Sequence, residues 1–123
     1  MVSACVFCDI VNGDAPAQKI HDWPAALAIV PLNQVAPGHV LVIPKSHVPD
    51  ASVDPMLTGI IAGYAAQFAA MWTKNGDYNL IVNCGEDASQ TVPHLHWHIV
   101  PRREGDGLHL PWTGQPTERD TTR

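Results

Sequence analysis

The chain has 123 residues, 46% hydrophobic and 15% charged, which is enough apolar material for one domain with a packed core. A net charge of −5 argues against a nucleic-acid partner, and the lack of an apolar run of about 18 residues argues against a membrane span. The first residues lack the regions of a signal peptide, so we expect a cytoplasmic protein whose cysteines are thiols or metal ligands.

Two cysteines spaced Cys-x-x-Cys, Cys5 and Cys8, open the chain. Such a pair can bind zinc, take part in redox exchange, or consist of two packed thiols. A redox role is typical of a strand that leads into a helix, and no strand pattern precedes this pair. A zinc site would need two further ligands from elsewhere in the chain. A short helical segment is predicted over 9–12.

Three strands are predicted in the first half of the chain. Strands over 18–21 and 25–30 are separated by an Asp-Trp-Pro turn. After a loop over 31–37, the run 39–44 is nearly all apolar, which predicts a central strand covered on both faces. His47 follows this strand and is either a surface histidine or a metal ligand.

The longest predicted element is an amphipathic helix of about five to six turns. It begins at Asp54-Pro55, an acidic N-cap followed by proline at the first helical position. Apolar residues continue at helical spacing as far as Trp72, and Asn75-Gly76 ends the helix. We expect the apolar stripe to pack in the core or in a dimer interface.

Three histidines at every second position, His94, His96 and His98, mark a strand over 94–100. Side chains alternate along a strand, so these histidines share one face and the apolar residues between them share the other. The strand follows a polar loop over 85–93, which can present hydroxyl, amide and backbone N–H donors to an anion.

Together these elements predict an α+β fold. With a further strand over 77–84, an antiparallel sheet of about five strands would pack one long helix on one face, with the histidines on the other face or its rim. A short N-terminal helix completes the domain. We assign residues 1–103 to this domain and 104–123 to a C-terminal tail without a core of its own.

The histidine strand allows two kinds of chemistry. Three histidines could bind one metal, but a straight strand spreads their rings over roughly 13 Å, which is too wide for one ion. Alternatively, the middle histidine attacks a phosphoryl centre and its neighbours bind the charged groups around it. Donors from Ser89, Gln90 and Thr91 could then stabilise the phosphoryl oxygens. No P-loop is present.

Four segments together resemble the histidine triad (HIT) family, whose signature is His-x-His-x-His-x-x with apolar residues at x. These segments are 5–14, 37–45, 83–91 and 94–100. The resemblance implies a HIT-like sheet domain that forms a homodimer. It also implies hydrolysis or transfer of nucleotides at the α-phosphate of nucleoside phosphoramidates, aminoacyl-adenylates or dinucleoside polyphosphates.

The resemblance implies roles for individual residues. His96 resembles the nucleophile that forms a covalent nucleotidyl-histidine intermediate. His98 resembles the histidine that binds phosphate and assists the leaving group, and Thr91 belongs to the same catalytic set. We expect substrate contacts from the matching positions His39, Asn83, Gln90, Thr91 and His98, and also from the loop residue Ser89 and from Asn33.

The resemblance extends to the Hint-like, zinc-binding bacterial branch of the family. In its members the paired cysteines join the histidine after a Pro-Lys-x-His stretch and the first histidine of the triad. Here those residues are Cys5, Cys8, His47 and His94, a Cys₂His₂ set of structural type. The implied cofactor is therefore a structural zinc ion, which leaves His96 and His98 for chemistry.

One position departs from the family. Pro31 stands where the family usually has Asp or Asn in contact with the ribose hydroxyls, and Asn33 is the nearby polar residue that can take this contact. The departure supports an alternative function, a nucleotide-binding regulatory dimer with little catalysis.

Overall fold

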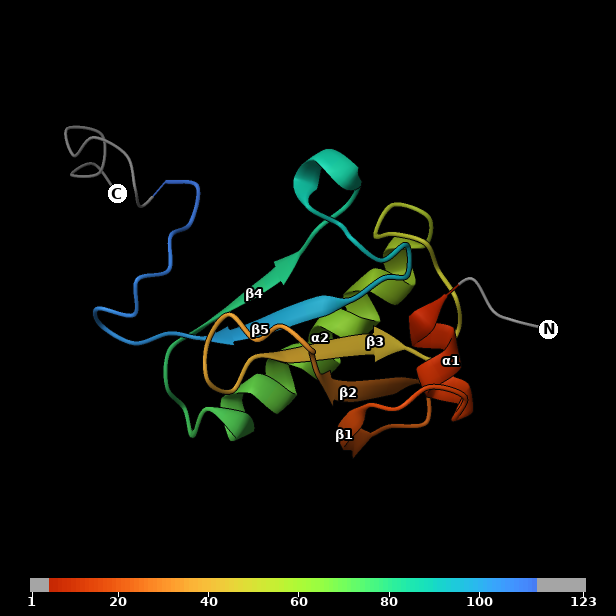
Figure 1. Cartoon of the computed structure of the whole chain (residues 1–123), viewed down its shortest axis with the longest axis horizontal. Coiled ribbons are helices and arrows are strands. Elements are labelled where there is room, and N and C mark those ends of the chain that lie inside the picture. The colour runs from red at the N-terminus through yellow and green to blue at the C-terminus, as the bar shows by residue number, and fades with distance from the viewer. Residues whose placement is uncertain (1–4, 113–123) are drawn as a thin grey trace.

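The structure is a computed structural model that describes residues 5–112 (Figure 1). The described part of the chain forms two α-helices, five strands and one short 3₁₀ helix, η1. In chain order the elements are α1 (Val6–Asn12), β1 (Gln18–Asp22), β2 (Ala26–Val30), β3 (Val40–Pro44), α2 (Pro55–Trp72), β4 (Tyr78–Val82), η1 (Glu86–Ala88) and β5 (Trp97–Pro101).

The strands form a single antiparallel sheet in the order β1-β2-β3-β5-β4. β3 lies at the centre and is buried along its whole length, as its apolar sequence predicted. β5 lies between β3 and β4, so that His98 is paired with Leu41 on one side and Ile81 on the other. The predicted α+β fold with five antiparallel strands is confirmed.

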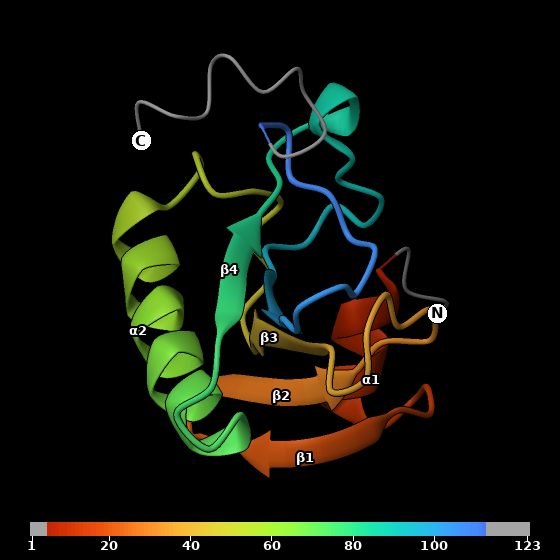
Figure 2. The ribbon, with the colours of Figure 1, turned by 90° about the vertical axis from the view of Figure 1, so that its left-hand side faces the viewer.

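The two faces of the sheet carry different helices (Figure 2). Val40 and Val42 of β3 point into a core shared with α2, whereas Leu41 and Ile43 point into a second core shared with α1. This alternation follows from the two-residue period of a strand. The histidine-bearing side therefore faces α1, and the long helix covers the opposite side.

The predicted histidine strand differs from the structure at its start. β5 begins at Trp97, not at His94. The backbone before it is bonded elsewhere, because the amide of Leu95 donates to the carbonyl of Val48 at 2.7 Å and that of His94 to Val92 at 2.8 Å. The expected alternation still holds, since Leu95, Trp97 and Ile99 pack in the α2 core.

Helix α2 starts as predicted. Asp54 caps it by accepting a hydrogen bond from the amide of Leu57 at 3.0 Å, and Pro55 occupies the first turn. The apolar stripe divides between two sides, however, because Ile61 is buried whereas Ile60 is 51% and Met71 62% exposed. Part of the stripe therefore lies outside the core of the single chain.

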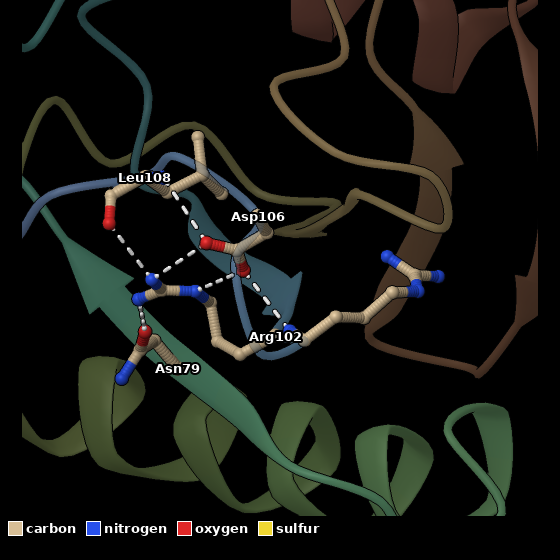
Figure 3. A network of polar contacts seen from close by, with 5 residues as sticks. Asn79, Arg102, Asp106 and Leu108 are labelled. Carbon is tan, nitrogen blue, oxygen red and sulfur yellow. Dashed lines mark hydrogen bonds and ion pairs between the residues drawn. The ribbon is translucent and has the colours of Figure 1, made fainter.

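A polar network holds the chain that follows β5 (Figure 3). The guanidinium of Arg102 donates to both carboxylate oxygens of Asp106, to Oδ1 of Asn79 on β4 at 2.7 Å, and to the carbonyl of Leu108 at 2.9 Å. The Arg102 guanidinium holds the pKa of the Asp106 carboxyl well below its ordinary value. This network folds residues 102–108 against the edge of the sheet.

The boundary between domain and tail at 103/104 stays a prediction, and the end of the tail lies outside the described residues. No helix within residues 5–112 is long and apolar enough to cross a membrane.

Candidate active site and metal centre

A cavity of about 510 Å³ opens on the α1 side of the sheet. Two of the three triad histidines, His96 and His98, line it together with His39, while α1, β2 and the loop after β2 supply most of its apolar wall. None of the described residues that line it is Asp, Glu, Lys or Arg. A bound phosphate would therefore meet neutral hydrogen-bond donors rather than fixed positive charges.

His96 is buried and held by the backbone. Its Nδ1 lies 2.7 Å from the carbonyl oxygen of His94. A carbonyl only accepts hydrogen bonds, so Nδ1 carries the proton and Nε2 keeps its lone pair. Burial lowers the pKa of His96, which favours the neutral ring. His96 thus places a neutral imidazole nitrogen, a possible nucleophile, in the wall of the cavity.

The proton on His98 is set through His39. The amide of Val35 donates to Nδ1 of His39 at 3.2 Å, so the proton of neutral His39 sits on Nε2. That Nε2 lies 3.0 Å from Nδ1 of His98. His98 Nδ1 must therefore accept, which leaves its own proton on Nε2.

The same arrangement opposes a positive charge on His98. A second proton on its Nδ1 would face the N–H of His39. Burial, followed by the charges of His96 and His39, lowers the pKa of His98 to about 4. The ring centroids of His96 and His98 are 5.0 Å apart. A lone pair on His96 and an N–H on His98 thus lie side by side at neutral pH.

The structure brings together only some of the expected substrate-binding residues. Asn33 and Thr91 line the cavity with His39, and so does Pro31, which offers no polar side-chain atom. Asn83, Ser89 and Gln90 do not line it.

Gln90 serves the backbone of its own loop. Its Oε1 accepts from the amide of Gly85 at 2.8 Å, and its Nε2 donates to the carbonyls of Pro49 and Val92 at 2.7 and 3.0 Å. Gln90 thus braces the loop that carries Thr91. Contacts of Asn83, Ser89 and Gln90 with a substrate stay predictions.

The third triad histidine, His94, lies in a separate cluster. Its Nδ1, Nδ1 of His47 and the Sγ atoms of Cys5 and Cys8 all lie within 4.8 Å of one another. Nδ1 of His94 is 3.3 Å from Sγ of Cys5, 3.6 Å from Sγ of Cys8 and 3.2 Å from Nδ1 of His47. The cluster unites α1, the chain after β3 and the segment before β5, so its members come from distant parts of the sequence.

These distances fit a tetrahedral zinc ion. Zn–N bonds near 2.0–2.1 Å and Zn–S bonds near 2.3 Å imply about 3.3 Å between two nitrogen ligands and about 3.5 Å between nitrogen and sulfur. Nε2 of His94 donates to the carbonyl of Pro44 at 2.9 Å, which leaves the Nδ1 lone pair toward the cluster. The donor set and the tautomer of His94 both suit the metal.

The two thiols lie close enough to affect each other's ionisation. Burial and the neighbouring Cys5 thiol raise the pKa of Cys8 to about 11, because two thiolates side by side repel each other. A divalent cation would reverse this preference and hold both sulfurs as thiolates. Among residues 5–112, this cluster is the one group of His, Cys, Asp and Glu side chains close enough together to hold a metal ion. It contains neither His96 nor His98.

Phe7, for which the sequence predicted no role, joins the two sites. Its ring packs edge to face with those of His94 and His96, with centroid distances of 5.6 and 5.2 Å. Its position between the two cysteines is the one signal in the sequence, since residues between paired ligands are held close to the metal. The amide of Val35 and the carbonyl of Pro44, which orient His39 and His94, could not be found from the sequence. Almost any residue type provides such backbone groups.

Known proteins resemble this chain along most of its length. The HIT domain family matches residues 12–105. The chain belongs to the HIT family. A solved HIT structure, a zinc-bound histidine triad family protein from Mycobacterium smegmatis, is 40% identical with a TM-score of 0.73 over 96% of this chain and 87% of that one.

Two curated HIT relatives are named as enzymes. Adenosine 5'-monophosphoramidase HNT1 of Saccharomyces cerevisiae is 32% identical over 96% of this chain and 75% of its own length. Adenylylsulfatase HINT3 of Arabidopsis thaliana is 32% identical over 97% of this chain, which spans 61% of that protein.

Proposed function

We propose that this HIT protein is a nucleotide hydrolase or transferase that acts at the α-phosphate through a covalent intermediate on His96. It is carried by two contacts in the cavity wall, between Nδ1 of His96 and the carbonyl of His94 and between Nε2 of His39 and Nδ1 of His98, which set the tautomers of His96 and His98. His96 offers a lone pair on Nε2, and His98 beside it offers an N–H on Nε2. One ring can attack a phosphorus atom while the other hydrogen-bonds the group that leaves.

The first step transfers the nucleotidyl group. Nε2 of His96 attacks the α-phosphorus, and the bond to the leaving group breaks with its electron pair on that group. A leaving amine carries a proton that its nitrogen takes from solvent, and the Nε2–H of His98 hydrogen-bonds that nitrogen as it departs, whereas a carboxylate or phosphate leaves as an anion. The positive charge that His96 gains remains on its ring, where Nδ1–H donates to the carbonyl of His94.

Water completes the reaction. Its oxygen attacks the phosphorus, the bond between phosphorus and Nε2 of His96 breaks, and the ring regains its lone pair. The proton from water passes to solvent, and both rings end in the form in which they began. The histidines are then ready for another turnover.

The cavity and the relatives support a class of substrates. The largely apolar wall suits a nucleobase, and the histidine end suits a phosphate. Two relatives are named for cleaving an adenosine phosphoramidate and an adenylylsulfate. These two substrates share a nucleotidyl group and differ in the leaving group. We include aminoacyl-adenylates and dinucleoside polyphosphates on the same chemistry, with Asn33 and Thr91 as polar contacts to the nucleotide.

Zinc belongs to this proposal as a structural ion. Cys5, Cys8, His47 and His94 would hold it, and its chemistry there is to join the N-terminal helix to the sheet. His96 follows His94 closely in the chain, so the joined segment also supports the nucleophile.

The function can be tested on the His98→Ala variant by intact-protein mass spectrometry. The variant is incubated with an adenosine phosphoramidate and, separately, with a diadenosine polyphosphate. We expect one added adenylyl group on His96, because loss of the His98 ring slows turnover of the intermediate. Tight AMP binding with no adduct and no turnover by the unaltered protein would instead favour the nucleotide-binding regulatory dimer, to which Pro31 in the cavity also points.

We also propose a homodimer. Apolar side chains are exposed on α2, with Met56 78%, Ile60 51% and Met71 62% accessible, and β4 forms one edge of the sheet. Light scattering should give the mass of two chains, and Ile60→Glu with Met71→Glu should reduce it to one. The mass of a single chain for the unaltered protein would contradict the dimer. The cytoplasmic location stays a prediction.

A further inference from the structure

We propose that Trp72, at the end of α2, is a positioning residue that holds the turn before His39 and thereby determines which nitrogen of His98 carries the proton. This inference rests on the proposed function for its effect on turnover. Its structural part, the tautomer of His98, can be measured without any substrate.

The turn at Gly38 is held by two close contacts. Gly38 has φ 85°, and a Cβ there would lie 3.1 Å from Cγ of Pro101 and 3.5 Å from Nε1 of Trp72. The indole N–H of Trp72 donates to the carbonyl of Gly38 at 2.9 Å. The end of the long helix thus reaches the residue directly before His39, although 34 positions separate the two partners.

This turn fixes the ring of His39. The amide of His39 donates to the carbonyl of Ala36 at 3.1 Å, which closes a turn with proline at its second position and Gly38 at its third. The next bond, from the amide of Val35 to Nδ1 of His39 at 3.2 Å, spans the same residues. Val35 and His39 can therefore stay bonded only while the turn keeps its shape.

The hydrogen bond from the amide of Val35 to His39 determines which nitrogens of His39 and His98 carry protons. If it is lost, Nδ1 of His39 can take the proton and Nε2 becomes an acceptor. His98 would then carry its proton on Nδ1 and lose it from Nε2, since the two rings share the 3.0 Å contact. In that arrangement His98 presents a lone pair to the leaving group in place of an N–H.

A matched pair of variants tests the inference. Trp72→Phe removes the indole N–H but keeps a ring to stack on Phe68, whose centroid lies 5.5 Å from that of Trp72. Trp23→Phe makes the same replacement beside the same phenylalanine, at 5.9 Å, and away from the Gly38 turn. Each variant is labelled with ¹⁵N-histidine, and the ring nitrogen shifts of His98 report its tautomer.

We expect the unaltered protein and Trp23→Phe to show His98 protonated on Nε2, and Trp72→Phe to show a mixture. Turnover should change in parallel. The kcat of Trp72→Phe should fall about fivefold on an amine-releasing phosphoramidate, as for one lost hydrogen bond. It should fall less than twofold on an aminoacyl-adenylate, because its carboxylate is a weakly basic leaving group that needs the hydrogen bond from His98 less, and KM should change little.

His39 should be needed for the effect. In a His39→Asn background, Trp72→Phe should cause no further fall in kcat, because the link between the turn and His98 is already broken. Gly38→Ala displaces the same carbonyl without altering Trp72, and it should reproduce the mixed tautomer if Trp72→Phe proves too unstable to study.

The inference is overturned if His98 keeps its Nε2 proton in Trp72→Phe and in Gly38→Ala, or if Trp23→Phe changes it equally. Equal losses on both substrates with an unchanged tautomer would show a merely structural role and would also overturn it. If the tautomer shifts as expected but no protein form turns over any nucleotide, the inference stands and the proposed function fails.

Discussion

Replacing His96 with alanine is expected to lower turnover by roughly four orders of magnitude or more, because the proposed reaction loses its nucleophile and not merely a binding contact. Among the described residues that line the cavity, the other two imidazoles are not placed to replace it, since Nε2 of His39 and Nδ1 of His98 are bonded to each other and Nε2 of His98 carries a proton. Steady-state hydrolysis of an adenosine phosphoramidate measures the loss, and isothermal titration with AMP measures whether nucleotide still binds.

His21→Ala is the matched control for this experiment. His21 packs against Trp23 and Phe68, with centroid distances of 4.4 and 5.8 Å, and does not line the cavity. It should keep normal turnover, and the circular dichroism spectra of both variants should match that of the unaltered protein. Near-normal turnover by a folded His96→Ala protein would rule out the covalent mechanism.

Replacing Cys5 and Cys8 together with serine is expected to remove bound zinc and to lower the melting temperature by about 15 °C. A ligand present at a thousand times its Kd stabilises the folded state by about 4 kcal/mol, which corresponds to such a shift in a domain of this size. The cluster joins α1 to the segments that follow β3 and precede β5, so its loss frees the N-terminal helix. Elemental analysis and thermal unfolding under reducing conditions provide the two measurements.

Cys84→Ser serves as the control, because Cys84 is exposed and its Sγ lies 3.3 Å from Oγ of Ser52, away from the cluster. It should keep the zinc and the melting temperature. A chelator should destabilise the unaltered protein and Cys84→Ser but leave the double variant unchanged. Zinc content that is the same with and without Cys5 and Cys8 would count against the metal centre.

Local rules were sufficient for much of the fold. The period of two in residues 94–100 placed Leu95 and Ile99 on one side of the sheet, and both lie in the α2 core. Asp54 and Pro55 marked the start of α2 correctly. The predicted start of β5 was three residues too early. The pattern of residues does not reveal that the amide of Leu95 bonds to the carbonyl of Val48 and not to a neighbouring strand.

The candidate site was predictable only in part. Residue types and the family resemblance pointed to Cys5, Cys8, His47 and His94, and the structure brings these four side chains together. They pointed equally to Gln90 as a substrate contact. In the structure its side-chain amide bonds to the backbone of Gly85, Pro49 and Val92. An amide side chain suits both uses, and the contact of Gln90 with a substrate stays a prediction.

Sequence patterns were enough to predict the α+β class, the two sides of the histidine segment and the residue types suited to holding zinc and attacking phosphorus. These properties follow from side-chain chemistry and from the periods of strands and helices, which act between near neighbours in the chain. The tertiary structure alone decided where the histidine protons lie, because the carbonyls of His94 and Pro44 and the amide of Val35 assign them. Every residue carries such backbone groups, so only the folded chain shows which ones reach a given ring.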